Sequence, residues 1–435
     1  MMKYINIGLL LITCFGIKAQ GGNDFKPLKD KIINLGKVIE DNEQFGEEYK
    51  NLDLLLKDVD IVMLGEQSHG EATTYQTKIK LIKYLHQKLD FDILVFESGF
   101  YECHKALDLI AQGKDRRDAM GESVTFVWST MKEFKPLVEY IESSSNSGNQ
   151  LKVLGFDNQF TGKLSKEYFI SDLSQYLNKI DVSIVQTKEW QHFTENCSHL
   201  TNYETKQLKR NHPELDTIYI NHLINEINNA SIDPLSGFWV QSLKSLKYFL
   251  SDISLKTDKR DQQMADNLIW IKENFPESKI ICWGATSHFL YNSMEVRMRN
   301  PIVQLLGGSY YKKQPMMGNY IKTKYDSKVF TIGFTAYKGK YGLTRGKKLR
   351  RPRKGTLEWL LSKSEHNNFL LPLKNINIKG YKSRPLGNFY MKNDAGQVMD
   401  AIIFNRTMKP PKLDHNFFLK MHPENKYVKP EVTEQ

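Results

Sequence analysis

The apolar run Ile61-Val-Met-Leu64 is followed at once by Gly65-Glu66-Gln-Ser-His69-Gly70. Four apolar residues in succession are typical of a strand buried in a parallel sheet. After Gly70, apolar residues recur at three- and four-residue spacing as far as Leu85, which predicts an amphipathic helix. A buried strand, a short polar turn and a helix together form the repeating unit of an α/β fold.

Three more short apolar runs resemble this strand and are separated by longer helical stretches. They are Ile93–Phe96, Leu151–Gly155 and Ile280–Trp283. Two further strand candidates, Val329–Phe334 and Ala401–Phe404, lie toward the C-terminal end. The sequence therefore predicts an α/β fold with a mainly parallel central sheet flanked by helices.

The chain is expected to form one α/β domain over residues 20–408. Within it, residues from about 165 to 255 are rich in Asn, Lys, Glu, Leu and Ile, which indicates an all-helical insertion or lid. Residues 409–435 show little periodicity and are expected to form a surface tail.

Residues 1–19 resemble a signal peptide. Lys3 supplies a positive start, Ile5–Ile17 is largely apolar, and the small residue Ala19 suits cleavage. No later segment has the eighteen or so apolar residues of a membrane helix. These features predict export to the periplasm or the medium after cleavage near Ala19, with no transmembrane segment.

The net charge of +11 comes from one segment of this 435-residue chain. Nine basic residues and no acidic residue lie between Tyr337 and Gly355. Apart from these and the two lysines of the leader, 50 basic residues balance 50 acidic ones. A nucleic-acid surface usually spreads over a whole face, so the basic loop 338–354 is interpreted as a polar loop and no nucleic-acid partner is expected.

Three cysteines remain after the leader, namely Cys103, Cys197 and Cys282. An odd number at wide spacing matches neither a disulfide framework nor a zinc site. One disulfide between two of them is compatible with export.

Ionisable residues follow each of the first four strand candidates. In open parallel sheets, ligands bind in the crevice beyond the carboxyl ends of the strands, so these side chains are expected to converge there. They are Glu66 with His69, then Glu97, Asp157 and His288.

Glu66 and His69 are three residues apart, which at the start of a helix would place both on one face. A carboxylate beside an imidazole fixes its tautomer and raises its basicity, as deprotonation of a water requires. Alternatively, Glu66 complements the helix dipole. Glu97 either pairs with Lys78 or Lys80 for structural reasons, or it holds the substrate or tunes His69.

The remaining candidates each have a structural and a functional interpretation. Asp157 is interpreted as mainly structural, and Trp128 either lines the cleft or packs against a helix. Arg260 either pairs with Asp261 or contacts the substrate. His288 is either a core histidine or polarises a substrate oxygen. Motifs of serine esterases, P-loop NTPases and zincins are absent from the sequence.

With these residues in place, the sequence resembles the erythromycin esterase family over roughly residues 30–408. The most specific match is Leu64-Gly-Glu-Gln-Ser-His-Gly70, which is similar to the family's Gly-Glu-x-Ser/Thr-His-Gly signature. Glu97 in Val-Phe-Glu-Ser, Asp157 in Gly-Phe-Asp and Arg260-Asp261 also match in pattern and order.

The resemblance implies an α/β fold with helical additions and hydrolysis by an activated water, without a covalent enzyme intermediate. It implies that His69 is the general base, Glu66 its partner and Glu97 one of the groups around the reacting atoms. Two positions depart from the family pattern. Ala285 replaces the first histidine of the Trp-Ala-His-Asn-x-His tract, and a basic position on the first helix, commonly arginine, is Lys78 or Lys80.

The leading hypothesis is an exported hydrolase that cleaves an ester or lactone of a small molecule without a cofactor. His69 takes the proton from water, Glu66 orients His69, and His288 stabilises the oxyanion. Lys78, Lys80, Trp128, Asp157 and Arg260 are the candidate substrate-binding residues. In one alternative, Glu66, His69, Glu97 and His288 hold a divalent metal. In another, a non-catalytic cell-envelope protein binds anionic lipid or polysaccharide through the basic loop.

Overall fold

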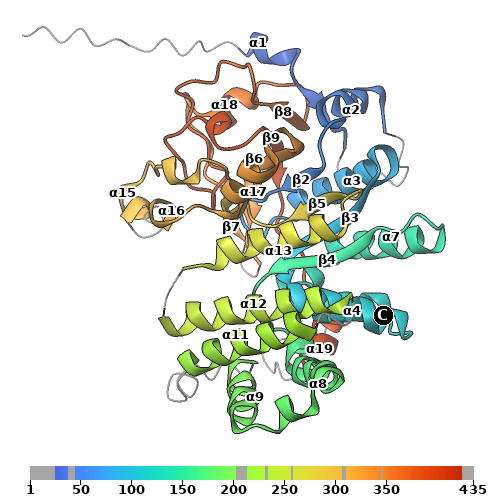
Figure 1. Ribbon diagram of the computed structural model, residues 1–435. Helices are drawn as coiled ribbons and strands as arrows, with labels where there is room; N and C mark the ends of the chain where they lie inside the picture. The colour runs from blue at the N-terminus through green and yellow to red at the C-terminus, as the bar shows by residue number, and fades with distance from the viewer. Residues whose placement is uncertain are drawn as a thin grey trace, which may run out of the picture.

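The computed structural model describes residues 25–37, 45–201, 213–230, 234–255, 258–305, 310–343 and 346–423 (Figure 1). The helices are α1 (Lys26–Lys29), α2 (Lys50–Leu56), α3 (Ala72–Leu89), α4 (Phe100–Ala111), α5 (Arg116–Ser123), α6 (Phe126–Ser129), α7 (Lys135–Asn146), α8 (Lys163–Ile180), α9 (Lys188–Thr201), α11 (Pro213–Ala230), α12 (Leu235–Leu255), α13 (Arg260–Asn274), α14 (Thr286–Phe289), α15 (Pro301–Val303), α16 (Tyr310–Lys313), α17 (Met317–Tyr325), α18 (Leu357–Leu361) and α19 (His415–Met421). The predicted signal peptide lies outside the described residues.

A mostly parallel sheet forms the centre of the fold. Its strands are β1 (Ile33–Asn34), β2 (Ile61–Leu64), β3 (Phe91–Gly99), β4 (Lys152–Asp157), β5 (Lys279–Trp283), β6 (Val329–Tyr341), β7 (Lys347–Lys348), β8 (Asn368–Pro372) and β9 (Ala401–Met408). They run in the order β1-β8-β9-β6-β2-β5-β3-β4, and β7 pairs with the end of β6. The contiguous strands from β9 to β4 in this order are mutually parallel. At the edges, β8 pairs antiparallel with β9, β1 with β8, and β7 with β6.

The predicted α/β fold is confirmed, and each of the six apolar runs forms or falls largely within a strand. The apolar runs are continuous because helices cover both faces of the sheet. Val62 and Leu64 of β2 pack in the cluster that includes α3 and α7, while Ile61 and Met63 pack in the cluster that includes α13 and α17. Each residue of β2 is therefore buried, whichever face of the sheet it points to.

The strand register brings the candidate residues to one edge of the sheet. Leu64 of β2 is opposite Trp283 of β5, and Trp283 is opposite Phe96 of β3. Phe96 is in turn opposite Gly155 of β4. Because these strands are parallel and in register, the residues that follow them emerge side by side at the carboxyl edge.

The described residues of the predicted insertion are almost entirely helical. Helices α8, α9, α11 and α12 gather at one end of the molecule (Figure 1). They enclose an apolar core of their own, built around residues such as Phe169, Phe193, Leu223 and Leu243. The helices therefore form a second packed layer beside the sheet, which confirms the helical composition expected for residues 165–255.

The expected surface tail is folded as far as Pro423. The short helix α19 is capped by Asp414, whose carboxylate accepts a hydrogen bond from the backbone N–H of Phe417 at 3.2 Å. Asp414 also pairs with Arg117 of α5 at 2.5 Å. Two turns of helix are too short to produce a clear periodic pattern, which explains why the sequence did not reveal α19.

The cysteines and the membrane prediction can also be assessed over the described residues. Cys103, Cys197 and Cys282 are all buried with free thiols, so the disulfide that export would allow is not formed here. No helix in the described ranges is both long and apolar enough to cross a membrane.

Candidate active site

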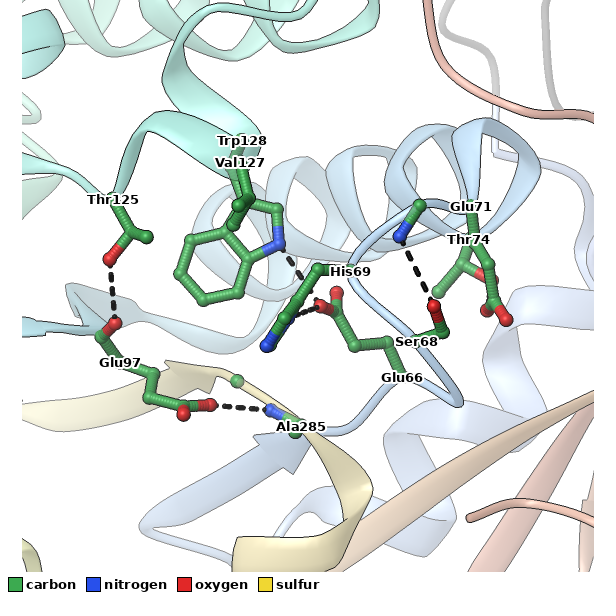
Figure 2. Close-up of polar contacts among 12 residues, drawn as sticks. Glu66, Ser68, His69, Glu71, Thr74, Glu97, Thr125, Val127, Trp128 and Ala285 are labelled. Carbon is green, nitrogen blue, oxygen red and sulfur yellow. Dashed lines mark hydrogen bonds and ion pairs between the residues drawn. The ribbon is translucent and has the colours of Figure 1, made fainter. Parts of the chain in front are cut away.

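Glu66 and His69 lie in the loop between β2 and α3. They were expected on the first turn of a helix, but α3 begins only at Ala72, so helical spacing is not what brings them together. The loop itself does so, because Nδ1 of His69 lies 2.6 Å from Oε1 of Glu66 (Figure 2). The predicted contact is present, although the predicted reason for it was wrong.

Glycines on both sides of the pair fix this loop. A Cβ at Gly65 would lie 2.3 Å from the hydroxyl of Thr286. A Cβ at Gly70 would lie 2.4 Å from the Cα of Gly342, and the N–H of Gly342 donates to the carbonyl of Gly70 at 2.8 Å. The two glycines of the sequence motif are thus required by close approach of neighbouring chain segments.

The buried carboxylate of Glu66 receives three donors. Nδ1 of His69 and Nε1 of Trp128 contact Oε1 at 2.6 and 3.0 Å (Figure 2), and Nζ of Lys78 contacts Oε2 at 2.8 Å. The Lys78 ammonium also lies 4.5 Å from the centroid of the Trp283 ring. A carboxylate without solvent contact requires such partners, and these fix the direction in which it presents Oε1 to His69.

His69 differs from Glu66 in being accessible. Its side chain is 41% exposed, whereas that of Glu66 is fully buried. Burial of the ring would lower the pKa of His69, but the hydrogen bond to Glu66 and its charge outweigh this and raise the pKa. With Nδ1 committed to Glu66, Nε2 is the nitrogen left to accept a proton.

Glu97 lies at the centre of a second group of charges. Its Oε1 accepts from Nη2 of Arg260 at 3.0 Å and lies 3.3 Å from Nε2 of His288. Its Oε2 accepts from the backbone N–H of Ala285 at 2.8 Å (Figure 2). Burial would raise the pKa of Glu97, but the nearby cations, led by His288, hold it well below the usual range. The partners of Glu97 are therefore Arg260 and His288, and the predicted pairing with Lys78 or Lys80 was wrong.

Asp157 and Arg260 form a two-point ion pair. Nε and Nη2 of Arg260 donate to the two oxygens of Asp157 at 3.0 and 2.6 Å. This geometry agrees with the structural interpretation of Asp157, which fixes the plane of the guanidinium. Arg260 nevertheless keeps 29% of its side chain exposed.

His288 is held between two carboxylates. Its Nδ1 lies 2.8 Å from Oδ1 of Asp261, and its Nε2 faces Glu97. Burial would lower the pKa of His288, but Asp261 and Glu97 raise it to about 10, so the ring is protonated near neutral pH. Because both nitrogens already face carboxylates, the geometry does not support the direct contact with an oxyanion that was expected of His288.

The chain segment after β5 connects the two charged groups. The carbonyl of Gly284 accepts from Lys78 at 3.3 Å, and the next N–H, of Ala285, donates to Glu97. Ala285 lacks the imidazole that the family commonly has at this position, and it contacts Glu97 through its backbone N–H. Figure 2 shows Glu66, His69, Trp128, Glu97 and Ala285 gathered in one region.

Lys80 does not belong to this site. Its ammonium donates to the carbonyls of Leu35 and Lys37 at 3.0 and 3.1 Å, on the side of α3 that faces the N-terminal segment. The prediction that Lys78 or Lys80 serves as the basic residue is thus decided in favour of Lys78, which lies two residues earlier and points toward Glu66.

The proposed metal ligands are already engaged with cations. Lys78 occupies one oxygen of Glu66, and Arg260 lies against Glu97 and near His288. Within the described ranges, no group of three or more His, Cys, Asp or Glu side chains is arranged to hold a metal ion. The four residues are divided between two hydrogen-bonded groups and do not converge on one point.

A network that the sequence did not predict supports the loop that carries Glu66 and His69. Nε2 of Gln67 donates to Oδ1 of Asn388 at 2.8 Å, and Nδ2 of Asn388 donates to the buried Glu71 at 3.2 Å. Burial raises the pKa of Glu71 to about 8. Gln67 and Glu71 adjoin the motif, but nothing in the sequence links them to a residue more than 300 positions away.

Comparison with known proteins identifies a family and several relatives of this chain. Residues 86–407 match a family model described as "Erythromycin esterase". A Bacillus subtilis (strain 168) protein named "Putative hydrolase YbfO" is 26% identical over 359 residues, which cover 76% of this chain and 78% of that protein. An Escherichia coli protein named "Erythromycin esterase type II" is 23% identical, covering 82% of this chain and 91% of that protein.

A solved structure shares the fold. This structure, described as an erythromycin esterase mutant, EreC, in its open conformation, matches with a TM-score of 0.58 and 16% sequence identity. The match covers 85% of this chain and 96% of that chain. At this level of identity, the likeness supports the architecture of the sheet and its helices.

We expect Gly70→Ala to destabilise the protein by about 1–3 kcal/mol, because the new methyl group would overlap the backbone of Gly342. Thermal unfolding of the purified variant measures this. Gly237→Ala is the matched control, since its methyl group would lie 3.6 Å from Trp270 inside helix α12, where alanine is favoured by about 1 kcal/mol. Equal unfolding temperatures for Gly70→Ala and the wild type would contradict the close approach.

Proposed function

Because its residues 86–407 match that family model, the chain belongs to the erythromycin esterase family, and we propose that it is a hydrolase that cleaves an ester or lactone bond with a water activated by His69. The observation that carries the proposal is the difference in solvent exposure between the hydrogen-bonded side chains of His69 and Glu66. His69 is exposed and Glu66 is buried, so the imidazole presents one nitrogen to solvent while the carboxylate holds the other.

In the first step, Nε2 of neutral His69 accepts a proton from a water molecule. The water oxygen forms a bond to the carbonyl carbon of the ester, and the carbonyl π electrons move to its oxygen. Glu66 stabilises the imidazolium, because its Oε1 accepts the Nδ1 proton at 2.6 Å. A positioned base of this kind typically contributes about 10²–10⁴-fold to the rate.

In the second step, the tetrahedral intermediate collapses and the bond from carbon to the leaving oxygen breaks. The imidazolium of His69 returns its proton to the leaving alkoxide, which gives a carboxylic acid and an alcohol. The histidine ends the cycle neutral, so no further co-reactant is required. Lys78 and Trp128 keep Glu66 in place throughout, since both bind it from the buried side.

Arg260 is the group that we assign to the developing oxyanion. Its Nε and Nη2 are fixed by Asp157 and Glu97, but in the described part of the chain Nη1 contacts only His288, at 3.4 Å. Because His288 is protonated, it offers that nitrogen no acceptor. Arg260 thus carries a positive charge, an exposed donor and a fixed plane, which suit charge stabilisation. His288 and Asp261 act as positioning residues for Glu97 and Arg260.

The substrate class rests on the relatives. One curated relative is named an erythromycin esterase, and this supports an ester or lactone as the bond cleaved. Ala285 has only a methyl group where the family commonly has an imidazole, so the acyl or alcohol part of the substrate is proposed to differ from that of a macrolide. The signal-like residues 1–19 support the further proposal that the protein works after export.

We expect His69→Ala to lower kcat for a hydrolysed ester by about 10²–10⁴-fold while the protein stays folded. A panel of chromogenic esters and lactones, followed with circular dichroism of each variant, provides the measurement. His222→Ala is the control, because His222 pairs with Glu226 on the surface of α11 at 3.6 Å. Full activity in His69→Ala, with His222→Ala equally active, would exclude the mechanism.

We expect kcat/KM to fall as the pH decreases through a value above 6.5. The base must be neutral, and Glu66 raises the pKa of His69 above its ordinary 6.5, so protonation removes activity from a higher pH downward. In Glu66→Gln/Lys78→Met, the ring stays buried but loses the negative charge of Glu66, so the pKa of His69 falls and the acidic limb moves to lower pH. The double change avoids leaving Lys78 buried without a counter-ion. An acidic limb that stays at the same pH would contradict the assignment.

We expect Arg260→Lys to reduce kcat by about 10²–10³-fold with a smaller effect on KM, because lysine cannot bind Asp157 at two points and still reach the substrate. Steady-state kinetics of the same ester tests this. The control is Arg117→Lys, which alters an ion pair with Asp414 away from the site. A rise in KM with unchanged kcat would instead indicate ground-state binding.

A further inference from the structure

The excess positive charge of this chain is concentrated on one exposed hairpin. We use the name basic hairpin for residues 338–354, which comprise the end of β6, strand β7 and the loop after it. Its described cations are all exposed, and none of them forms an ion pair within the described ranges. They are Lys338, Lys340, Lys347, Lys348, Arg350, Arg351, Arg353 and Lys354.

The pairing of the two strands concentrates this charge further. Lys340 of β6 is directly opposite Lys348 of β7, and the neighbouring pair is Tyr341 with Lys347. Like charges placed opposite each other on paired strands are destabilising. No acidic residue lies in the segment to relieve the repulsion. A bound polyanion would offset it.

The basic hairpin stands on the edge of the sheet that carries the candidate active site. Strands β2 and β6 are parallel, and Leu64 at the end of β2 is opposite Ile332. Strand β6 then continues past the end of β2 as far as Tyr341. The next residue, Gly342, donates its N–H to the carbonyl of Gly70, in the loop that carries Glu66 and His69.

A buried arginine fastens the base of the basic hairpin to the same loop. The guanidinium of Arg384 donates to the carbonyls of Ala336 and Arg350 at 2.8 and 2.7 Å. The carbonyl of Arg384 accepts from Gln67, the neighbour of Glu66, at 2.7 Å. Leu349 also packs with Ala336 and Met408. The cations are therefore held in a fixed relation to Glu66 and His69.

Two other polyanionic surfaces fit the basic hairpin poorly. A bilayer would be expected to receive an apolar anchor, but no large exposed apolar side chain lies among its described residues. Single-stranded nucleic acid would be expected to stack on aromatic rings. Tyr337 and Tyr341 are instead partly buried against apolar clusters.

We propose that the basic hairpin is a docking surface for a carboxylated polysaccharide, which it holds beside the Glu66–His69 pair. Eight exposed cations, four on the paired strands and four in the loop after β7, suit an extended chain with many separate charges better than one small anion. The surface binds through charge, so its affinity falls as salt is added. The further statement that the bound chain carries the ester to be cleaved rests on the proposed function.

The test measures binding in a protein that cannot turn over substrate. His69→Ala protein is titrated with alginate, with neutral dextran, with a single-stranded oligonucleotide and with vesicles containing phosphatidylserine. We expect alginate to bind most tightly and to be released by high salt, and dextran not to bind. Because His69→Ala removes the base, this result stands or falls independently of whether the wild type hydrolyses esters.

The deciding variant is Lys338→Gln/Lys347→Gln/Lys348→Gln/Arg351→Gln. We expect its affinity for alginate to fall at least about tenfold at low salt. The matched control, Lys88→Gln/Lys179→Gln/Lys188→Gln/Lys374→Gln, removes four exposed lysines elsewhere. It therefore has the same net charge as the deciding variant. Equal losses in the two variants, or tighter binding of the oligonucleotide or the vesicles than of alginate, would overturn the proposal.

Discussion

The structure depends on one buried carboxylate, Glu66, that is hydrogen-bonded to the exposed His69. Glu66 has no contact with solvent and is held by an ammonium and an indole N–H on its buried side. The desolvation of such a group is costly, and the cost is offset only when every partner is in place. The positions of Lys78 and Trp128 thus follow from the same requirement that makes His69 basic.

The second charged group meets the same requirement in a different way. Glu97, Asp157 and Asp261 place three carboxylates around two cations, Arg260 and His288. The strands deliver Glu97 and Asp157 to the edge, and helices α13 and α14 deliver their partners. The outcome is a guanidinium fixed in plane but still exposed on one side, whereas the imidazolium beside it is enclosed. Both groups are cations, but the more exposed Arg260 can contact a substrate, whereas the enclosed His288 can only position its neighbours.

Charge is also organised on the scale of the whole molecule. Acidic and basic residues are balanced over most of the chain. The excess positive charge lies on the basic hairpin, which extends β6 past the carboxyl edge of the neighbouring strand β2. Parallel strands that end together create the edge, and the strand that continues past it forms a platform beside the site. Arg384 connects that platform to Gln67, so the site and the charged surface share one support.

The sequence by itself determined the parallel sheet, the helical layer and the meeting of acids and bases at strand ends, because apolar runs and the register of parallel strands are local consequences of residue type. It also identified Glu66 with His69 as a pair. Only the tertiary structure showed that Lys78, and not Lys80, binds Glu66. It also showed that His288 is enclosed, that Arg260 is partly exposed and that Asn388 binds Glu71. The burial and the partners of these polar side chains depend on segments that are up to hundreds of residues apart, so the spacing within one segment does not specify them.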